Sequence, residues 1–98
     1  MKDEVVNGHP IRCYDRESDK TTDRYTVIYM NDKYVKSPLM GPRAYTVYGA
    51  VGMSAYPFHP QGFGQHCTAM PGKHLGKRIK FADLPADCQK LVQQDTKQ

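Results

Sequence analysis

The sequence predicts an α+β fold: a small, mostly antiparallel sheet, one C-terminal helix and a long, ordered loop rich in proline, glycine and histidine. Two stretches rich in Tyr, Val, Ile and Thr, Arg24–Met30 and Ala44–Val51, are typical of strands. Near the C-terminus, apolar residues recur with the period of a helix. Between them, Met53–Lys80 contains too many prolines and glycines for regular structure over most of its length.

The stretch Arg24–Met30 has two apolar faces. Alternation places one set on one face: Tyr25, Val27 and Tyr29. The other face receives the remaining set: Thr26, Ile28 and Met30. A strand that is apolar on both sides is expected at the centre of the sheet.

Shorter signals extend the sheet. Ile11–Tyr14 is predicted as a short strand, and Lys77–Phe81 as another with Ile79 and Phe81 facing inward. Asn31–Asp32 indicates a turn, after which Lys33–Val35 begins a return strand. Gly49 within Ala44–Val51 predicts a bulge or a close approach of the backbone.

The helix is predicted from Leu84 to Gln94. Asp83 is the expected N-cap, and Pro85 falls in the first turn, where its missing N–H costs little. One apolar stripe follows at helical spacing: Leu84, Cys88, Leu91 and Val92. This stripe is expected to dock on the sheet.

Length and composition predict a single domain over residues 1–98, with residues 1–10 and 95–98 loosely attached. No apolar run is long enough to span a bilayer, and the first residues lack the apolar core of a signal peptide. Three cysteines without a CxxC pair predict reduced thiols: Cys13, Cys67 and Cys88. These features favour a location in the cytoplasm.

Charge is distributed unevenly along a chain whose net charge is +4. Residues 33–82 contain no Asp or Glu. Seven basic residues lie in that span: Lys33, Lys36, Arg43, Lys73, Lys77, Arg78 and Lys80. If the fold gathers them, they form a face that attracts anions; otherwise they form a solvated surface.

The predicted ligand-binding site combines the loop His59–Cys67 with the basic segment Lys73–Lys80. Four residues are expected to neutralise phosphates: Lys73, Lys77, Arg78 and Lys80. Tyr56 and Phe63 would stack on bases, as Tyr14 and Tyr48 could, although core packing competes for every tyrosine. Further polar contacts are expected from four residues: His59, Gln65, His66 and His74. Gly72 and Gly76 are expected to free backbone amides for phosphate oxygens.

Metal binding and catalysis are less favoured than binding. The potential zinc ligands His59, His66, Cys67 and His74 lack the short spacings of a chelating loop, so we expect no metal and no cofactor. No hydrolase or paired-carboxylate motif is present, and no catalytic residue is assigned. An acid–base pair would require His59 or His66 to meet a distant carboxylate of one loop: Asp15, Asp19 or Asp23.

Four segments resemble a family of small uncharacterised proteins encoded by bacteriophages, prophages and mobile elements. They are Ile11–Asp15, Asp23–Tyr29, Pro57–His66 and His74–Val92. The family has no assigned activity, so the resemblance transfers no role to any residue. It implies a small accessory protein acting in the cytoplasm of a bacterial host.

The leading hypothesis is therefore a phage-type accessory protein that binds a phosphate-bearing ligand, either nucleic acid or nucleotide. One alternative is a protein inhibitor of a host defence complex, anti-CRISPR-like or otherwise anti-defence. The other is a small metal-dependent or histidine-based enzyme. The sequence leaves the oligomeric state open, and it predicts no membrane partner.

Overall fold

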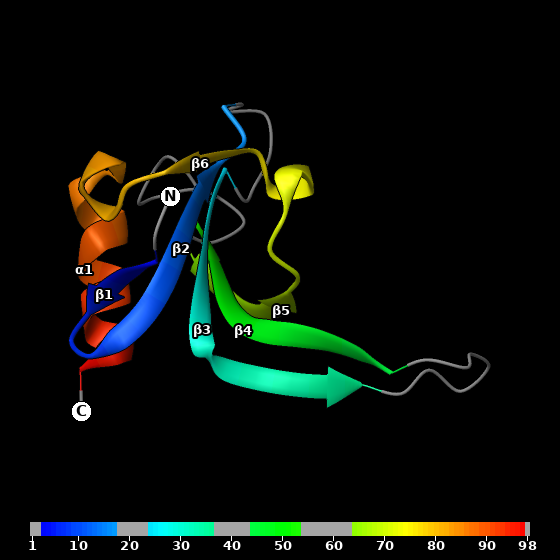
Figure 1. Cartoon of the computed structure of the whole chain (residues 1–98). Coiled ribbons are helices and arrows are strands. Elements are labelled where there is room, and N and C mark those ends of the chain that lie inside the picture. Colours follow the sequence, from blue (N-terminus) through cyan, green and yellow to red (C-terminus); the bar gives the residue numbers. More distant parts are fainter. Residues whose placement is uncertain (1–2, 18–23, 37–43, 54–63, 98) are drawn as a thin grey trace.

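The computed structural model describes residues 3–17, 24–36, 44–53 and 64–97. Six strands, two short 3-10 helices and one α-helix follow in chain order (Figure 1). They are β1 (Glu4–Val6), β2 (His9–Asp15), β3 (Tyr25–Lys36), β4 (Tyr45–Met53), β5 (Gly64–Ala69), η1 (Lys73–Leu75), β6 (Lys77–Ile79), η2 (Phe81–Asp83) and α1 (Ala86–Thr96). The predicted combination of an antiparallel sheet with one C-terminal helix is confirmed.

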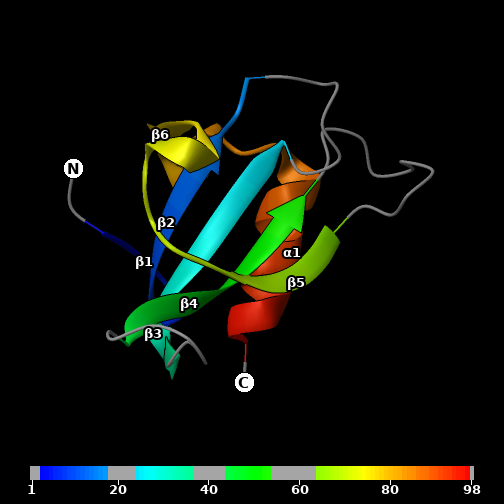
Figure 2. The same cartoon turned by 90° about the vertical axis from the view of Figure 1, so that its right-hand side faces the viewer.

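Strands β1 to β5 neighbour one another in chain order, and every pairing is antiparallel. The sixth strand, β6, returns to β2 and shares an edge with β1. Strand β1 pairs with His9–Ile11, and β6 pairs with Cys13–Asp15. These two short strands therefore lie end to end along β2, which places β1 next to a strand that begins more than seventy residues further on (Figure 2).

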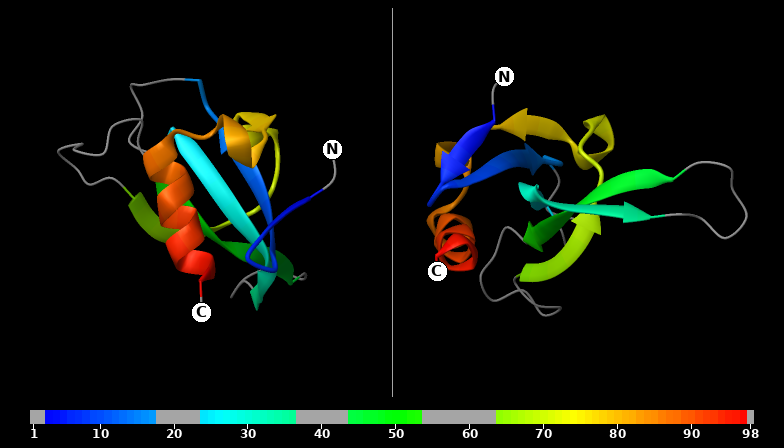
Figure 3. Two further views of the ribbon diagram at one scale, coloured as in Figure 1. Left: turned by 90° about the vertical axis from the view of Figure 1, so that its left-hand side faces the viewer. Right: turned by 60° about the horizontal axis from the view of Figure 1, so that its bottom comes forward.

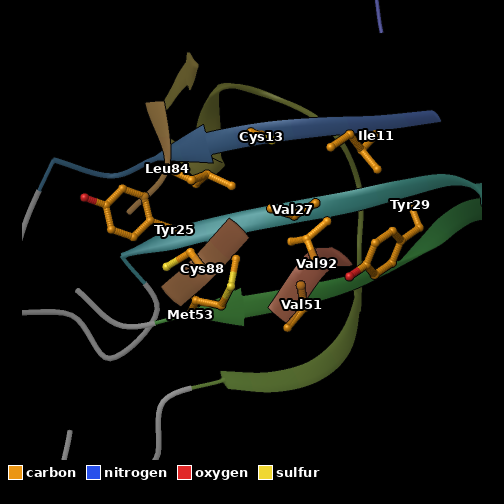
Figure 4. Close-up of a cluster of buried hydrophobic side chains, with 10 residues drawn as sticks. All are labelled: Ile11, Cys13, Tyr25, Val27, Tyr29, Val51, Met53, Leu84, Cys88 and Val92. Carbon is orange, nitrogen blue, oxygen red and sulfur yellow. The ribbon is translucent and has the colours of Figure 1, made fainter. Parts of the chain in front are cut away.

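Helix α1 covers one face of this sheet (Figure 3). The apolar residues of the helix meet the face of β3 that carries Tyr25, Val27 and Tyr29, as Figure 4 shows. Ten buried residues form this main core: Ile11, Cys13, Tyr25, Val27, Tyr29, Val51, Met53, Leu84, Cys88 and Val92. The opposite face of β3 is also buried through Ile28, so the prediction of a central strand is confirmed.

The predicted turn at Asn31–Asp32 is wrong, because β3 continues through it to Lys36. The pairing with β4 shifts between Tyr29 and Lys33, where β3 contains extra residues that β4 lacks. A polar Asn-Asp pair suits such a bulge as well as a turn, and bulges bend the strand that carries them. Beyond this point β3 and β4 change direction and project as a two-stranded ribbon (Figure 1).

Gly49 lies at this bend, opposite Tyr29. A Cβ atom at Gly49 would collide with the carboxylate of Asp32. The predicted close approach at Gly49 is therefore confirmed, although a side chain makes it rather than backbone. The ribbon beyond the bend exposes three large side chains to solvent: Tyr34, Val35 and Tyr45.

The helix begins later than predicted, at Ala86, and Asp83 is not its N-cap. Pro85 occupies the N-cap position, while Asp83 Oδ2 accepts the backbone N–H of Lys80 at 3.2 Å and so closes η2. Pro85 has no backbone N–H with which to continue the hydrogen bonding of η2, so η2 ends before it and α1 begins after it. The predicted strand at Lys77–Phe81 is likewise shorter, because Phe81 already belongs to η2.

Described residues near both ends of the chain bond to the rest of the fold. Strand β1 is paired along its length, and Glu4 Oε1 accepts the N–H of Phe81 at 2.8 Å. At the other end, Thr96 is only 2% exposed and accepts a hydrogen bond from Asn7 Nδ2 at 3.1 Å. The polar residues of these segments bond to one another, a pairing that composition does not reveal.

The second face of the sheet carries a smaller core of four buried residues: Tyr14, Ile28, Ala50 and Leu75. Leu75 belongs to η1, which therefore crosses this face. Part of the segment predicted as irregular is regular, since residues 64–69 form β5. The remainder of the predicted Pro/Gly/His-rich loop, residues 54–63, lies outside the described residues.

Candidate functional site

Four basic or titratable side chains lie exposed on η1, β6 and the residue that follows β6. We call them the cationic strip: Lys73, His74, Lys77 and Lys80. In the described part of the chain, every ion pair joins an arginine or a histidine to an aspartate, and none involves a lysine. The lysine charges of the strip are therefore available to an external anion.

Packing of the strip's backbone explains why its side chains point outward. Leu75 is buried against the second face of the sheet, so its neighbours face solvent. Gly76 adopts φ of +106°, and a Cβ there would collide with the backbone of Asp15. The N–H of Gly76 donates to the carbonyl of Lys73 at 3.0 Å, so this amide is not free for phosphate, contrary to expectation.

Arg78 differs from the lysines because it is engaged within the fold. Its Nη2 donates to Asp3 Oδ1 at 3.2 Å, and Nε of Arg12 donates to the same oxygen at 2.5 Å. The hydrogen bond from Arg12, followed by the charges of both guanidinium groups, lowers the pKa of Asp3 below its ordinary value. This cluster ties the N-terminus to β2 and β6, so the role of Arg78 includes positioning β6.

His66 belongs to a different cluster, centred on Asp95 near the end of α1. His66 Nε2 lies 2.8 Å from Asp95 Oδ2, and the hydroxyl of Tyr29 donates to the same oxygen at 2.7 Å. Burial, and then the hydrogen bond to Asp95, raise the pKa of Tyr29 above its ordinary value. Three elements, β3, β5 and α1, thus converge on one carboxylate.

The Asp95 cluster borders a hollow with two adjoining lobes. One lobe has a volume of about 330 Å³ and includes Tyr34, His66 and Cys67 in its lining. The other has a volume of about 250 Å³ and includes His9 and Asn31, whose side chains lie 2.9 Å apart. Three residues line both lobes: Tyr29, Asp32 and Asp95. We call this hollow the carboxylate cavity.

The structure divides the predicted site residues between two faces. His66 lies opposite Val51, a main-core residue, and so faces α1, whereas Leu75 carries η1 across the other face. The strip's β6 pairs with β2, while β5 pairs with β4 at the far edge of the sheet. No residue of the strip lines either lobe of the cavity. His66 and the lysines are therefore not brought together.

The remaining predicted residues are placed as follows. Tyr56, His59 and Phe63 lie outside the described residues, and Gln65 lies in β5 opposite Gly52. Tyr14 is buried and Tyr48 is half-buried against the smaller core, so core packing takes both. The exposed tyrosines among the described residues are instead on the ribbon: Tyr34 and Tyr45.

Sequence reasoning missed the cavity because its members are far apart in the chain. Asp95 lies in a stretch expected to be loose, and Asp32 was assigned to a turn. Tyr29 was expected to share one apolar face with Tyr25 and Val27, but nothing in its spacing pointed to Asp95. The nearest signal was the tyrosine-rich strand itself, since buried tyrosines need a hydrogen-bond partner.

In the described ranges, the structure shows no metal centre and no contact between Asp15 and His66; the other candidates for an acid–base pair, Asp19, Asp23 and His59, lie outside the described residues. Over residues 3–17, 24–36, 44–53 and 64–97, no group of three or more His, Cys, Asp or Glu is arranged to hold a metal ion. Asp15 bonds Arg24 at 3.0 Å rather than a histidine. The carboxylate that His66 contacts is Asp95, through Nε2 of the imidazole ring.

Comparison of the chain with protein-family models, with curated proteins and with solved structures finds no match. Within the described part of the chain, α1 and the two 3-10 helices are each too short and too polar to cross a bilayer.

Proposed function

We propose that the protein binds a phosphate-bearing ligand, nucleic acid or nucleotide, through the cationic strip. One observation carries the proposal: Lys73, Lys77 and Lys80 are all exposed, and no carboxylate among the described residues pairs with them. Unpaired ammonium groups a few residues apart attract phosphate oxygens through charge-assisted hydrogen bonds. His74, which is also exposed, adds an imidazole that can donate a hydrogen bond.

The nearby carboxylates support the proposal because they are occupied elsewhere. Asp3 bonds Arg12 and Arg78, Asp15 bonds Arg24, and Asp83 accepts the N–H of Lys80. Arginine side chains pair with Asp3 and Asp15, and none of the three carboxylates pairs with a lysine side chain. The lysine is a point charge that accommodates many phosphate geometries, which suits a backbone contact more than recognition of one base.

A salt titration tests the strip directly. Binding of a fluorescent single-stranded oligonucleotide, followed by anisotropy, should weaken linearly in log–log form as salt rises. The Lys73→Gln/Lys77→Gln double variant should reduce the slope by about 1.4, because each phosphate contact on a single strand contributes about 0.7.

The matched control is Lys90→Gln/Lys97→Gln, which removes the same charge from exposed lysines on and just after α1. It should leave the slope within about 0.3 of the wild-type value if the strip makes the contacts. Equal effects of the two double variants would show that net charge alone drives binding. Affinity that does not change with salt would overturn the proposal.

A protein inhibitor of a host defence complex is the second candidate, and the projecting ribbon favours it. Val35 is 66% exposed there, beside the exposed rings of Tyr34 and Tyr45. Apolar side chains on a free ribbon are typical of a surface that a macromolecular partner covers. An absence of oligonucleotide and nucleotide binding, together with a complex that survives nuclease treatment, would favour this candidate over the first.

A further inference from the structure

The carboxylate cavity has a chemistry opposite to that of the rest of the protein. The whole chain carries a net charge of +4, yet none of the described residues that line the two lobes is a Lys or an Arg. Two carboxylates, Asp32 and Asp95, line both lobes. This hollow therefore repels the phosphates that the strip attracts.

Hydrogen bonds from the described residues satisfy these carboxylates only in part. Asp95 receives the hydroxyl of Tyr29 and Nε2 of His66, and both contacts fall on Oδ2. No hydrogen bond from the described residues reaches its Oδ1. At the bend, Asp32 accepts a hydrogen bond from Tyr34, which raises the pKa of that phenol above its ordinary value. Tyrosine hydroxyls orient the carboxylates without neutralising their charge.

The side chains that line the cavity, and its volume, indicate which class of ligand fits there. Tyr29 and Tyr34 both contribute to the larger lobe, and a tyrosine ring attracts a cation placed over its face. The described residues offer no set of three ligands for a metal ion, which separates this hollow from a divalent-cation site. A volume of about 330 Å³ admits a group of several heavy atoms rather than a bare ion.

We propose that the carboxylate cavity binds an organic cation, an alkylammonium or guanidinium group, between Asp32 and Asp95. The N–H donors of such a group match the carboxylate oxygens, and its alkyl stem lies against the tyrosines. Gly49 is part of the site, because only a residue without a Cβ leaves room for the Asp32 carboxylate. The site is separate from the cationic strip and does not depend on the function proposed for it.

The test uses n-butylammonium and methylguanidinium as probes, with n-butanol as the uncharged control, at constant ionic strength. Amide chemical shifts of ¹⁵N-labelled full-length protein should move saturably at Gly49, Cys67 and Thr68, which line the larger lobe. Asp32→Asn should weaken the affinity about tenfold, the effect of losing one charge-assisted hydrogen bond. Asp87→Asn, an exposed carboxylate in the first turn of α1, should change it less than about twofold.

Gly49→Ala provides a second variant that keeps both charges but displaces the Asp32 carboxylate, and it should weaken binding as Asp32→Asn does. Spermidine and a short lysine- or arginine-containing peptide then distinguish a small-molecule source of the cation from a protein side chain. The proposal is overturned if butanol binds as well as butylammonium, if the shifts cluster elsewhere, or if Asp32→Asn binds normally. It is also overturned if Mg²⁺ or Ca²⁺ competes at equal concentration.

Discussion

At the scale of single residues, two glycines allow close contacts with residues far away in the chain, and the sequence does not reveal which residues these are. Gly76 lets the strip's backbone reach the backbone of Asp15, and Gly49 lets Asp32 fold over β4. At both positions, the space that a Cβ atom would need is already occupied by another atom. Gly49 was recognisable as an interruption in a strand, whereas the partner of neither glycine could be named from the chain.

Gly76→Ala should lower the free energy of unfolding by about 2–4 kcal/mol, because it combines a positive φ with a collision against backbone. Gly8→Ala is the matched control, since Gly8 also has positive φ, +83°, but its Cβ would meet no atom within 4 Å. That control should cost only about 1 kcal/mol, the penalty of the left-handed conformation alone. Urea denaturation of the two variants measures the difference, and equal losses would mean that the contact with Asp15 is unimportant.

At the scale of elements, the helix stripe and the two-faced strand were both predictable, because each depends on a period of the chain. Cys88 and Val92 recur on one side of α1, and Tyr25 and Val27 recur on one side of β3. The boundaries of the elements depend instead on individual hydrogen bonds and on strand pairing. Asp83 bonds within η2 instead of capping α1, and the bulge in β3 replaces a turn.

Val92→Ala tests whether this stripe holds α1 on the sheet. Val92 is fully buried among β3, β4 and α1 side chains, so the substitution should lower the free energy of unfolding by about 1.5–3 kcal/mol. Lys90→Ala, at an exposed position of the same helix, should change it by less than about 0.5 kcal/mol. Thermal or urea unfolding followed by circular dichroism gives both values. A Val92→Ala protein as stable as wild type would contradict the packing in Figure 4.

At the scale of the whole molecule, the main core contains three ionisable groups that folding keeps neutral. Burial raises the pKa of Cys13 from 9.0 to about 12 and that of Cys88 from 9.0 to about 11. The pKa of Tyr29 also rises, through burial and its bond to Asp95. Two of them come from the sheet, on β2 and β3, and the third comes from α1.

Stability should therefore fall in alkali. Below about pH 9 the two thiols are protonated in both the folded and the unfolded chain, and their contribution is fully present. As pH rises from about 9 towards 11 and 12, the unfolded chain loses these protons first, and the free energy of unfolding declines. The slope is about 1.4 kcal/mol per pH unit for each group between its two pKa values.

Urea unfolding at pH 7 to 11 checks this decline. Cys13→Val should make the decline shallower, because it removes one of the titrating groups. Val51→Ala is the control: it damages the same core without an ionisable group, so it should lower stability at every pH and keep the wild-type slope. Identical slopes in all three proteins would show that thiol ionisation does not limit alkaline stability.

The candidate sites, like the fold, include features that the sequence predicts and features that it does not. The cationic strip was predictable, because its four members lie within eight residues of the chain and charged side chains are usually exposed. The engagement of Arg78 by Asp3 was not, because the two meet only when β1 and β6 share an edge of β2. The carboxylate cavity was also beyond prediction, since Asp32 and Asp95 are sixty-three residues apart.

The sequence alone determined the classes of element, the apolar faces of the central strand and the helix, and the acid-free basic half of the chain. These are local or periodic properties, which neighbouring residues fix between them. The tertiary structure alone decided which charges are paired, which tyrosines are exposed, and that His66 meets Asp95 away from the lysines. Such contacts depend on strand order and on the bend in β3, and the free energy that selects them comes from the packing of the whole core.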